Sequence, residues 1–186
     1  MGGVYSFALH AETCGIYLDA DVNHVEVYGN MLENGDWTGF QCINLKTNAG
    51  VNIHNNTVSG FDQAEALFYN TLSSDPTPQP YYLRGVTFTG NSLTATGSAY
   101  CLYIHNYFAD PTRNYGTWTA NTYNRSGSGL TIYYREEYSG GSDRILTLRT
   151  FKAETGLDAG SLSNAALARF GTRRLLINGK PVQVSM

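Results

Sequence analysis

The chain has 186 residues, only 15% of them charged, and a formal net charge of −3 at pH 7. This balance, without any basic run, gives no reason to expect a nucleic-acid partner, and no stretch is apolar for long enough to span a membrane. The 14 tyrosines, 8 phenylalanines and 20 glycines are typical of strand-rich chains, and this length predicts one domain with a substantial core.

A short phrase recurs four times along the chain, as HVEVYGNML, VNIHNNTV, VTFTGNSL and GTWTANTY. Each copy alternates apolar and polar residues, which predicts a strand with one buried face. A small or polar residue then precedes an asparagine, which indicates a tight bend. The asparagines follow one another at intervals of 26, 35 and 30 residues, and they are Asn30, Asn56, Asn91 and Asn121.

Repetition at such intervals predicts a solenoid, in which each strand pairs in parallel with its copy in the next coil. The asparagines would then stack at one corner. Their side-chain amides could hydrogen-bond up and down the stack, which would satisfy groups that are costly to bury unpaired. The sequence therefore predicts an asparagine ladder.

One further strand is expected before each phrase and a short one after each asparagine. The strands before the phrases are predicted at Gly15–Asp19, Cys42–Lys46, Ala66–Asn70, Cys101–His105 and Leu130–Tyr134. Two excursions, Ser73–Tyr82 and Asn106–Tyr115, leave adjacent coils at the same corner, where loops often form the wall of a binding site.

The pattern weakens after Tyr134. One strand-like stretch remains at Ile145–Phe151, Ser163–Phe170 could form a short helix, and Asn178-Gly179 between apolar runs indicates a hairpin. We expect residues 1–162 to form the solenoid and residues 163–186 to form a small cap of the same domain.

These phrases, with the GIYLD-type coil at Gly15 and the threonine-glycine-x-aspartate run from Thr155 to Asp158 followed by Ser161, resemble the right-handed parallel β-helix, or pectin-lyase-like, superfamily. The resemblance implies an all-β fold, a right-handed parallel β-helix of about five coils with a small C-terminal cap. The chain is similar to the C-terminal half of a polysaccharide-lyase-like protein. The parent family is extracellular or periplasmic, although this chain shows no signal-peptide pattern. An uncovered N-terminal coil would favour a homo-oligomer.

The outward side chains of the strands before the phrases are the candidate site. The inward pairs are expected to be Ile16/Leu18, Ile43/Leu45, Leu67/Tyr69, Leu102/Ile104 and Leu130/Ile132. The outward residues then form two columns that mix aromatic and polar groups: Tyr17, Asn44, Phe68, Tyr103 and Thr131 in one, and Asp19, Lys46, Asn70, His105 and Tyr133 in the other. Such a surface suits a polysaccharide or oligosaccharide, because rings stack on sugar faces and polar groups bond hydroxyls. The predicted substrate-binding residues are Tyr17, Asn44, Phe68, Asn70 and Tyr103.

For elimination from a uronate, a base removes the C5 proton and a cation neutralises the carboxylate. The candidates for base or acid are His105 and Tyr133, and those for the cation are Lys46 and Arg113. No organic cofactor is expected; Ca²⁺ is the one candidate metal, with Asp19 and Asp21 as its ligands, although two carboxylates are few for calcium.

The leading expectation is a carbohydrate-active protein, similar to polysaccharide lyases, that acts on or binds an acidic polysaccharide. Two alternatives stay open. A non-catalytic carbohydrate-binding or assembly module would need only the outward aromatic surface and an exposed coil end. A glycoside or ester hydrolase on the same scaffold would need a carboxylate pair or an activated nucleophile, and no pair in the sequence stands out.

Overall fold

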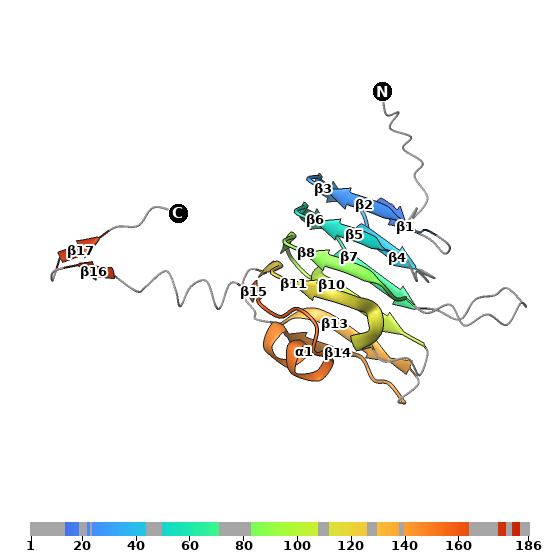
Figure 1. Ribbon diagram of the computed structural model, residues 1–186. Coiled ribbons are helices and arrows are strands. Elements are labelled where there is room, and N and C mark those ends of the chain that lie inside the picture. The colour runs from blue at the N-terminus through green and yellow to red at the C-terminus, as the bar shows by residue number, and fades with distance from the viewer. Residues whose placement is uncertain are drawn as a thin grey trace, which may run out of the picture.

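The computed structural model describes residues 14–18, 22, 24–43, 50–70, 83–107, 112–125, 130–137, 140–163, 175–177 and 180–182. This part of the chain is almost entirely β-structure, arranged as three parallel sheets that face one another around a common core (Figure 1).

The six-stranded sheet runs in the order β1 (Cys14–Leu18), β4 (Thr38–Ile43), β7 (Ala64–Asn70), β10 (Tyr100–Asn106), β13 (Leu130–Glu136) and β14 (Arg144–Thr147). The four-stranded sheet consists of β11 (Gly116–Thr119), β8 (Val86–Thr89), β5 (Val51–His54) and β2 (Val25–Tyr28). The five-stranded sheet consists of β15 (Leu162–Ser163), β12 (Thr122–Arg125), β9 (Ser92–Ala95), β6 (Thr57–Phe61) and β3 (Met31–Gly35).

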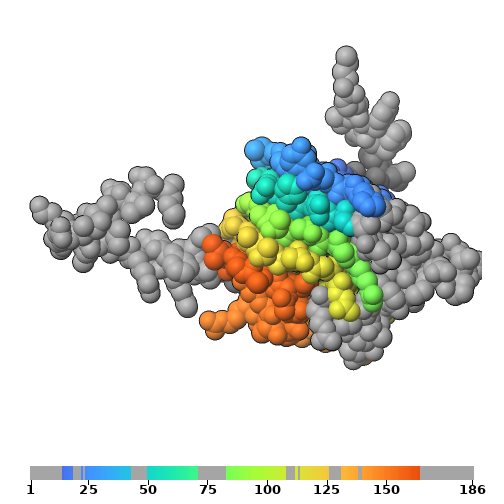
Figure 2. Space-filling model, viewed as in Figure 1, coloured from blue at the N-terminus to red at the C-terminus, as the bar shows by residue number. Residues whose placement is uncertain are grey.

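The chain visits the six-, four- and five-stranded sheets in turn and then returns to the six-stranded sheet, so one strand from each sheet makes a coil. Each strand pairs in parallel with its counterpart one coil away, except for antiparallel β14. Figure 2 shows the coils as coloured layers stacked in chain order, from blue to orange. This arrangement is consistent with a β-helix-like solenoid, as the repeats predict.

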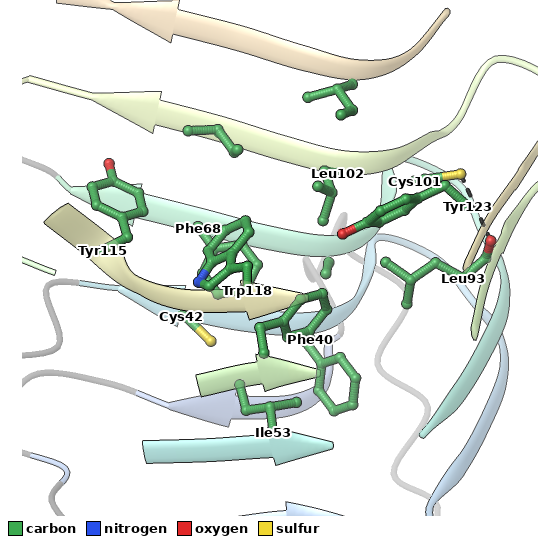
Figure 3. Packing of buried hydrophobic residues seen from close by; sticks show 14 of the residues in the cluster. Phe40, Cys42, Ile53, Phe68, Leu93, Cys101, Leu102, Tyr115, Trp118 and Tyr123 are labelled. Atoms are coloured by element: carbon green, nitrogen blue, oxygen red, sulfur yellow. Dashed lines mark hydrogen bonds between the residues drawn. The ribbon is translucent and has the colours of Figure 1, made fainter. Parts of the chain in front are cut away.

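The core lies between the three sheets, where the inward apolar side chains of successive coils pack against one another. Phe68 of β7 packs against Phe88 of β8 and Trp118 of β11, with ring centroids 5.3 and 4.4 Å apart. Figure 3 shows Phe68 and Trp118 beside each other in the core. All three rings are buried. The alternating apolar residues of the repeated phrases therefore supply the interior, as a half-buried strand requires.

The bend between the four- and five-stranded sheets repeats in every coil. The residue before each ladder asparagine has a positive φ: Gly29, Asn55, Gly90 and Ala120, at 64°, 55°, 64° and 55°. This left-handed conformation favours glycine and asparagine, which explains the small or polar residue in the repeat.

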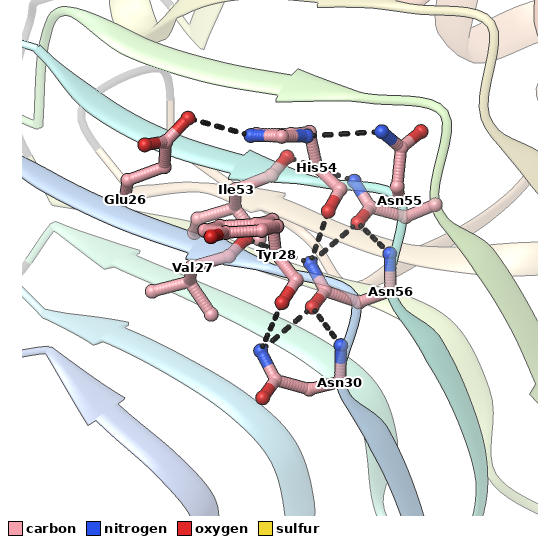
Figure 4. Close-up of polar contacts among 9 residues, drawn as sticks. Glu26, Val27, Tyr28, Asn30, Ile53, His54, Asn55 and Asn56 are labelled. Atoms are coloured by element: carbon pink, nitrogen blue, oxygen red, sulfur yellow. Dashed lines mark hydrogen bonds and ion pairs between the residues drawn. The ribbon is translucent and has the colours of Figure 1, made fainter.

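The predicted asparagine ladder is present. Asn30 donates from its backbone N–H and its Nδ2 to Oδ1 of Asn56, at 3.0 and 2.9 Å (Figure 4). Asn56 donates in the same way to Asn91, and Asn91 to Asn121. Each buried Nδ2 also donates to a backbone carbonyl one coil back, such as Asn91 Nδ2 to Ile53 O at 3.0 Å.

The ladder ends on different side chains in the last coil. The backbone N–H of Asn121 donates to Ser161 Oγ and its Nδ2 donates to Asp158 Oδ1, both at 2.8 Å. Tyr123 donates to the other carboxyl oxygen of Asp158 at 2.7 Å. Burial raises the pKa of Asp158. The aspartate and serine noted in the sequence thus take the place of a fifth asparagine.

The C-terminal end of the six-stranded sheet is closed by antiparallel β14 and by helix α1 (Leu148–Thr155). The strand predicted at Ile145–Phe151 is wrong in its second half, because Thr147 accepts a hydrogen bond from the N–H of Thr150 and begins the helix. In the described part of the chain, no helix is long and apolar enough to cross a membrane.

The hairpin expected around Asn178-Gly179 is present as β16 (Leu175–Ile177) paired antiparallel with β17 (Lys180–Val182). Ser163, the first residue of the helix expected at Ser163–Phe170, ends β15, and the rest of that segment lies outside the described residues. The loop at Ser73–Tyr82 and the middle of the second excursion also lie outside them. Part of that excursion, Thr112–Tyr115, forms a 3₁₀ turn before β11.

Candidate functional site

The outer surface of the six-stranded sheet carries a group of aromatic side chains that we name the tyrosine face: Tyr69, Tyr100, Tyr103, Tyr107 and Tyr133. Register places Tyr103 of β10 opposite Tyr133 of β13, and their rings stack with centroids 4.2 Å apart and an interplanar angle of 16°. Tyr100 lies 5.7 Å from Tyr133, and Tyr107 lies 5.8 Å from Tyr69, centroid to centroid. None of the five rings is fully buried.

A polar cluster borders the tyrosine face at the carboxyl ends of β10 and β13. We name it the His105 cluster: His105, Arg135, Glu137 and Asp143. His105 stands opposite Arg135 in register and its Nε2 lies 3.1 Å from Glu137 Oε1. Its ring lies against Tyr69 and Tyr107, at 5.1 and 4.5 Å between centroids.

One guanidinium joins the two carboxylates of the His105 cluster. Arg135 Nη2 lies 2.7 Å from Glu137 Oε1, and Arg135 Nη1 lies 2.8 Å from Asp143 Oδ1. The Tyr133 hydroxyl also donates to Asp143 Oδ1, at 2.7 Å. Tyr133 thus links the tyrosine face to the His105 cluster through a hydrogen bond.

The charges in this cluster follow from these contacts. Hydrogen bonding from Arg135 lowers the pKa of Glu137, and hydrogen bonding from Tyr133 and then Arg135 lowers the pKa of Asp143. Burial lowers the pKa of His105, and the hydrogen bond to Glu137 opposes it. At neutral pH the cluster holds two carboxylates, one guanidinium and a neutral imidazole.

The hydrogen-bond partners of His105 fix its tautomer. Ionised Glu137 can only accept, so Nε2 of the imidazole carries the proton and donates it. The Nδ1 atom then keeps its lone pair and can act as a base. Chemically, His105 Nδ1 can accept a proton from a ligand that lies beside the tyrosine face. The tyrosine hydroxyls and the carboxylates of Glu137 and Asp143 can form hydrogen bonds with the same ligand.

Four of the predicted site residues lie on the outer face of the six-stranded sheet, as expected: Tyr17, Tyr103, His105 and Tyr133. Tyr17 is 49% exposed, whereas Gln41 and Leu67, which lie between it and Tyr103 in the same column, are nearly buried. Tyr133 stands opposite Tyr103 rather than opposite His105, so the predicted column of His105 with Tyr133 is wrong by two residues.

The outward positions predicted for Phe68 and Asn70 are wrong. Phe68 is fully buried in the core, and Ala66 and Phe68, not Leu67 and Tyr69, are the inward pair. Asn70 is also fully buried: its Nδ2 donates to Asn106 Oδ1 and its Oδ1 accepts from the N–H of Leu83, both at 3.2 Å. It belongs to a second, shorter asparagine stack and is no part of the outer surface.

The remaining predicted residues cannot be placed on this surface. Asp19, Asp21, Asn44 and Lys46 lie outside the described residues, and so does the side chain of Arg113. Among the residues that the structure describes, no three histidine, cysteine or acidic side chains are grouped so as to hold a metal ion.

The sequence interpretation missed Arg135, Glu137, Asp143 and Tyr69. The spacing from the ladder asparagine is not constant: Cys42 and Phe68 follow theirs by twelve residues, whereas Ile104 and Tyr134, which are in register with Phe68, follow theirs by thirteen. Counting from the ladder therefore does not fix the inward face of β7. It does set Arg135 beside His105, because each follows its asparagine by fourteen residues. Asp143 reaches the site from the segment before β14, which no repeat predicts.

A second histidine lies on the outer face of the four-stranded sheet (Figure 4). His54 Nε2 contacts Glu26 Oε1 at 2.9 Å, its Nδ1 lies 3.0 Å from Asn55 Nδ2, and its ring stacks on Tyr28 at 5.3 Å. Both nitrogens are engaged, so this group offers no free base, in contrast to His105.

No known protein family, no curated protein and no solved structure matches this chain.

Proposed function

We propose that the chain is a carbohydrate-binding β-helix protein of the right-handed, pectin-lyase-like kind, and that the tyrosine face with the His105 cluster is its saccharide site. The observation that carries the proposal is the row of aromatic rings along successive coils, bordered by hydrogen-bonding side chains. Aromatic rings pack on the C–H faces of sugars, and carboxylate, hydroxyl and imidazole groups bond their hydroxyls.

The arrangement of the tyrosine face fits an extended oligosaccharide better than a single sugar. Tyr69, Tyr103 and Tyr133 come from three adjacent coils, and parallel strands lie about 4.8 Å apart. A sugar chain crossing the strands could therefore contact aromatic groups of several coils. An oligosaccharide gains affinity from such repeated contacts, each of them modest by itself.

The test is saccharide binding by the wild type and by a Tyr103→Ala/Tyr133→Ala double variant, measured by affinity electrophoresis and calorimetry over a polysaccharide panel. We expect at least a tenfold loss of affinity in the double variant, because it removes two stacked rings. Tyr28→Ala is the matched control, since Tyr28 is an exposed tyrosine (61%) of the four-stranded sheet. An equal loss in the control, or no binding by the wild type, would overturn the proposal.

A second candidate is a polyuronate lyase with His105 as the base. The hydrogen bond from His105 Nε2 to Glu137 and the neutral imidazole favour it, because Nδ1 could remove a proton next to a carboxylate. Absorbance near 235 nm over a panel of pectate, alginate, hyaluronan and glucuronan, with and without calcium, tests for it. A rise that is lost in His105→Ala would establish elimination.

The hydrolase alternative has a carboxylate pair in Glu137 and Asp143, bridged by Arg135. Hydrolysis of a glycoside needs one of the two carboxyls protonated as the general acid, which requires a raised pKa. Both pKa values are lowered instead, so the pair does not favour hydrolysis.

A further inference from the structure

The His105 cluster carries a net negative charge. Arg135 contributes one positive charge, Glu137 and Asp143 each contribute a negative charge, and His105 is neutral at pH 7. Both terminal nitrogens of the guanidinium are engaged, one by each carboxylate. The cluster therefore sums to about −1, and each terminal nitrogen of its single cation already contacts a carboxylate.

This charge balance matters for a sugar unit that lies beside His105. A uronate carboxylate placed there would face Glu137 and Asp143, and like charges at a shared site disfavour each other. It could reach Arg135 only at the N–H groups that Glu137 and Asp143 leave unused, close to both of these carboxylates. Anionic ligands are therefore opposed at this end of the tyrosine face.

Sugar hydroxyls, unlike a uronate carboxylate, can donate hydrogen bonds to Glu137 and Asp143. An ionised carboxylate has about four lone-pair sites, and Glu137 and Asp143 each use only some of them for Arg135, His105 and Tyr133. The side chains of Glu137 and Asp143 are 25% and 57% exposed, so these acceptors are reachable from solvent. A hydroxyl donating to a carboxylate makes a strong, charge-assisted hydrogen bond.

We propose that the sugar unit bound beside His105 is uncharged, with hydroxyl groups that donate to Glu137 and Asp143. The inference rests on the saccharide-binding function proposed above, and it names the class of glycan as a neutral one rather than a polyuronate. It applies to the His105 end of the tyrosine face only. At the opposite end, Arg125 lies over the ring of Tyr100, 5.4 Å from its centroid.

Matched pairs of hexasaccharides that differ only in the oxidation of C6 test this directly. We would titrate the wild-type protein calorimetrically with β-1,4-mannohexaose against β-1,4-hexamannuronate, and with cellohexaose against β-1,4-hexaglucuronate, at low ionic strength. In at least one pair, we expect the neutral member to bind at least tenfold more tightly. Added salt is expected to narrow the difference, because salt screens the repulsion.

The double variant Glu137→Gln/Asp143→Asn removes two negative charges with little change of shape, so the net charge of the cluster changes from about −1 to about +1. It is expected to weaken the neutral ligand and to bring the acidic ligand to equal or tighter binding. Glu26→Gln on the four-stranded sheet is the matched control and is expected to change neither. Circular dichroism confirms that each variant is folded.

The outcomes separate the two proposals. If the wild-type protein binds neither hexasaccharide of any pair and none of the polysaccharides in the wider panel, the proposal of saccharide binding itself is overturned. Tighter binding of the acidic member to the wild type would overturn the neutral-glycan inference and leave saccharide binding in place. That second result would favour the lyase candidate.

Discussion

Glu65 of β7 is fully buried, and neither of its carboxyl oxygens has a hydrogen-bond partner among the described residues. Burial raises the pKa of Glu65 to about 7, and the nearby backbone amides of Phe61 and Gly60 oppose this rise. Below its ordinary pKa of 4.5 the group is protonated in both the folded and the unfolded state. Between 4.5 and about 7 the folded state alone keeps the proton, so folding is favoured at the acidic end of this range.

We therefore expect the free energy of unfolding to fall as pH rises from 4.5 to about 7 and to level off above 7. Glu65→Gln should remove this dependence and raise stability at pH 8.5 by roughly 2 kcal/mol, because a charged carboxylate no longer has to be buried. At pH 4.5 the variant and the wild type should be equally stable. Urea unfolding at the two pH values measures the effect.

Glu33→Gln serves as the control for this prediction, because Glu33 is an exposed glutamate in the neighbouring five-stranded sheet. It should leave the pH profile unchanged. If Glu65→Gln destabilises the protein equally at both pH values, the carboxyl group has a partner in the folded state and its burial is not the source of the dependence.

At the scale of the element, the asparagine ladder makes a graded prediction. Asn91 is buried and connects two neighbours: it accepts from Asn56 and donates to Asn121 and to Ile53 O. Asn91→Ala leaves these groups unpaired, and the expected cost is roughly 2–4 kcal/mol. Asn30 stands at the solvent-facing end of the ladder and accepts no described ladder bond, so Asn30→Ala should cost about 1 kcal/mol or less.

Chemical denaturation of the two variants checks this gradient, with unchanged slope against urea as the sign that both unfold in the same way. Equal costs at the two positions would mean that the ladder amides contribute through the local bend alone. The cost at Asn91 would then not come from its hydrogen bonds to neighbouring coils.

The elements also show what the sequence could predict. The repeated phrases predicted the strands, the bends and the ladder. An alternating pattern followed by a turn residue and asparagine indicates a half-buried strand that ends in a bend. The strand Ala64–Asn70, with sequence AEALFYN, was ambiguous, because adjacent Leu67 and Phe68 are both apolar and alternation alone cannot choose its inward face.

That ambiguity is the reason why the candidate site was predicted only in part. A one-residue slip turns every side chain of a strand to the other face. Tyr103 and His105 were placed outward because β10 has a clear inward pair in Leu102 and Ile104. Phe68 and Asn70 were placed outward because β7 has none. Arg135 and Asp143 join His105 through cross-strand register and a segment beyond the repeats, which local pattern does not encode.

At the scale of the whole molecule, the two ends of the solenoid differ. The C-terminal end is closed by β14, α1 and the Asp158–Ser161 ladder end. In the first described coil, Ile16, Val25 and Leu32 are only partly buried, whereas Val51 and Val58 of the next coil are fully buried. Because each coil packs mainly on its neighbours, stability should rise from the first coil inward.

The three free cysteines report on this gradient. Cys14 lies in β1 and is partly exposed, while Cys42 in β4 and Cys101 in β10 are fully buried. Burial raises the pKa of the Cys42 thiol, and it raises that of Cys101 to about 12, so neither reacts unless the structure opens.

Labelling of single-cysteine variants with a disulfide reagent, the other two cysteines replaced by alanine, should therefore give three rates. Cys14 should react in the folded protein, Cys42 through opening of the first coils, and Cys101 only through global unfolding. Urea should accelerate the labelling of Cys101 most steeply, because its opening exposes the most surface. If Cys42 and Cys101 share one rate and one urea dependence, the described coils open as a single cooperative unit, and the half-buried residues of the first coil do not weaken it.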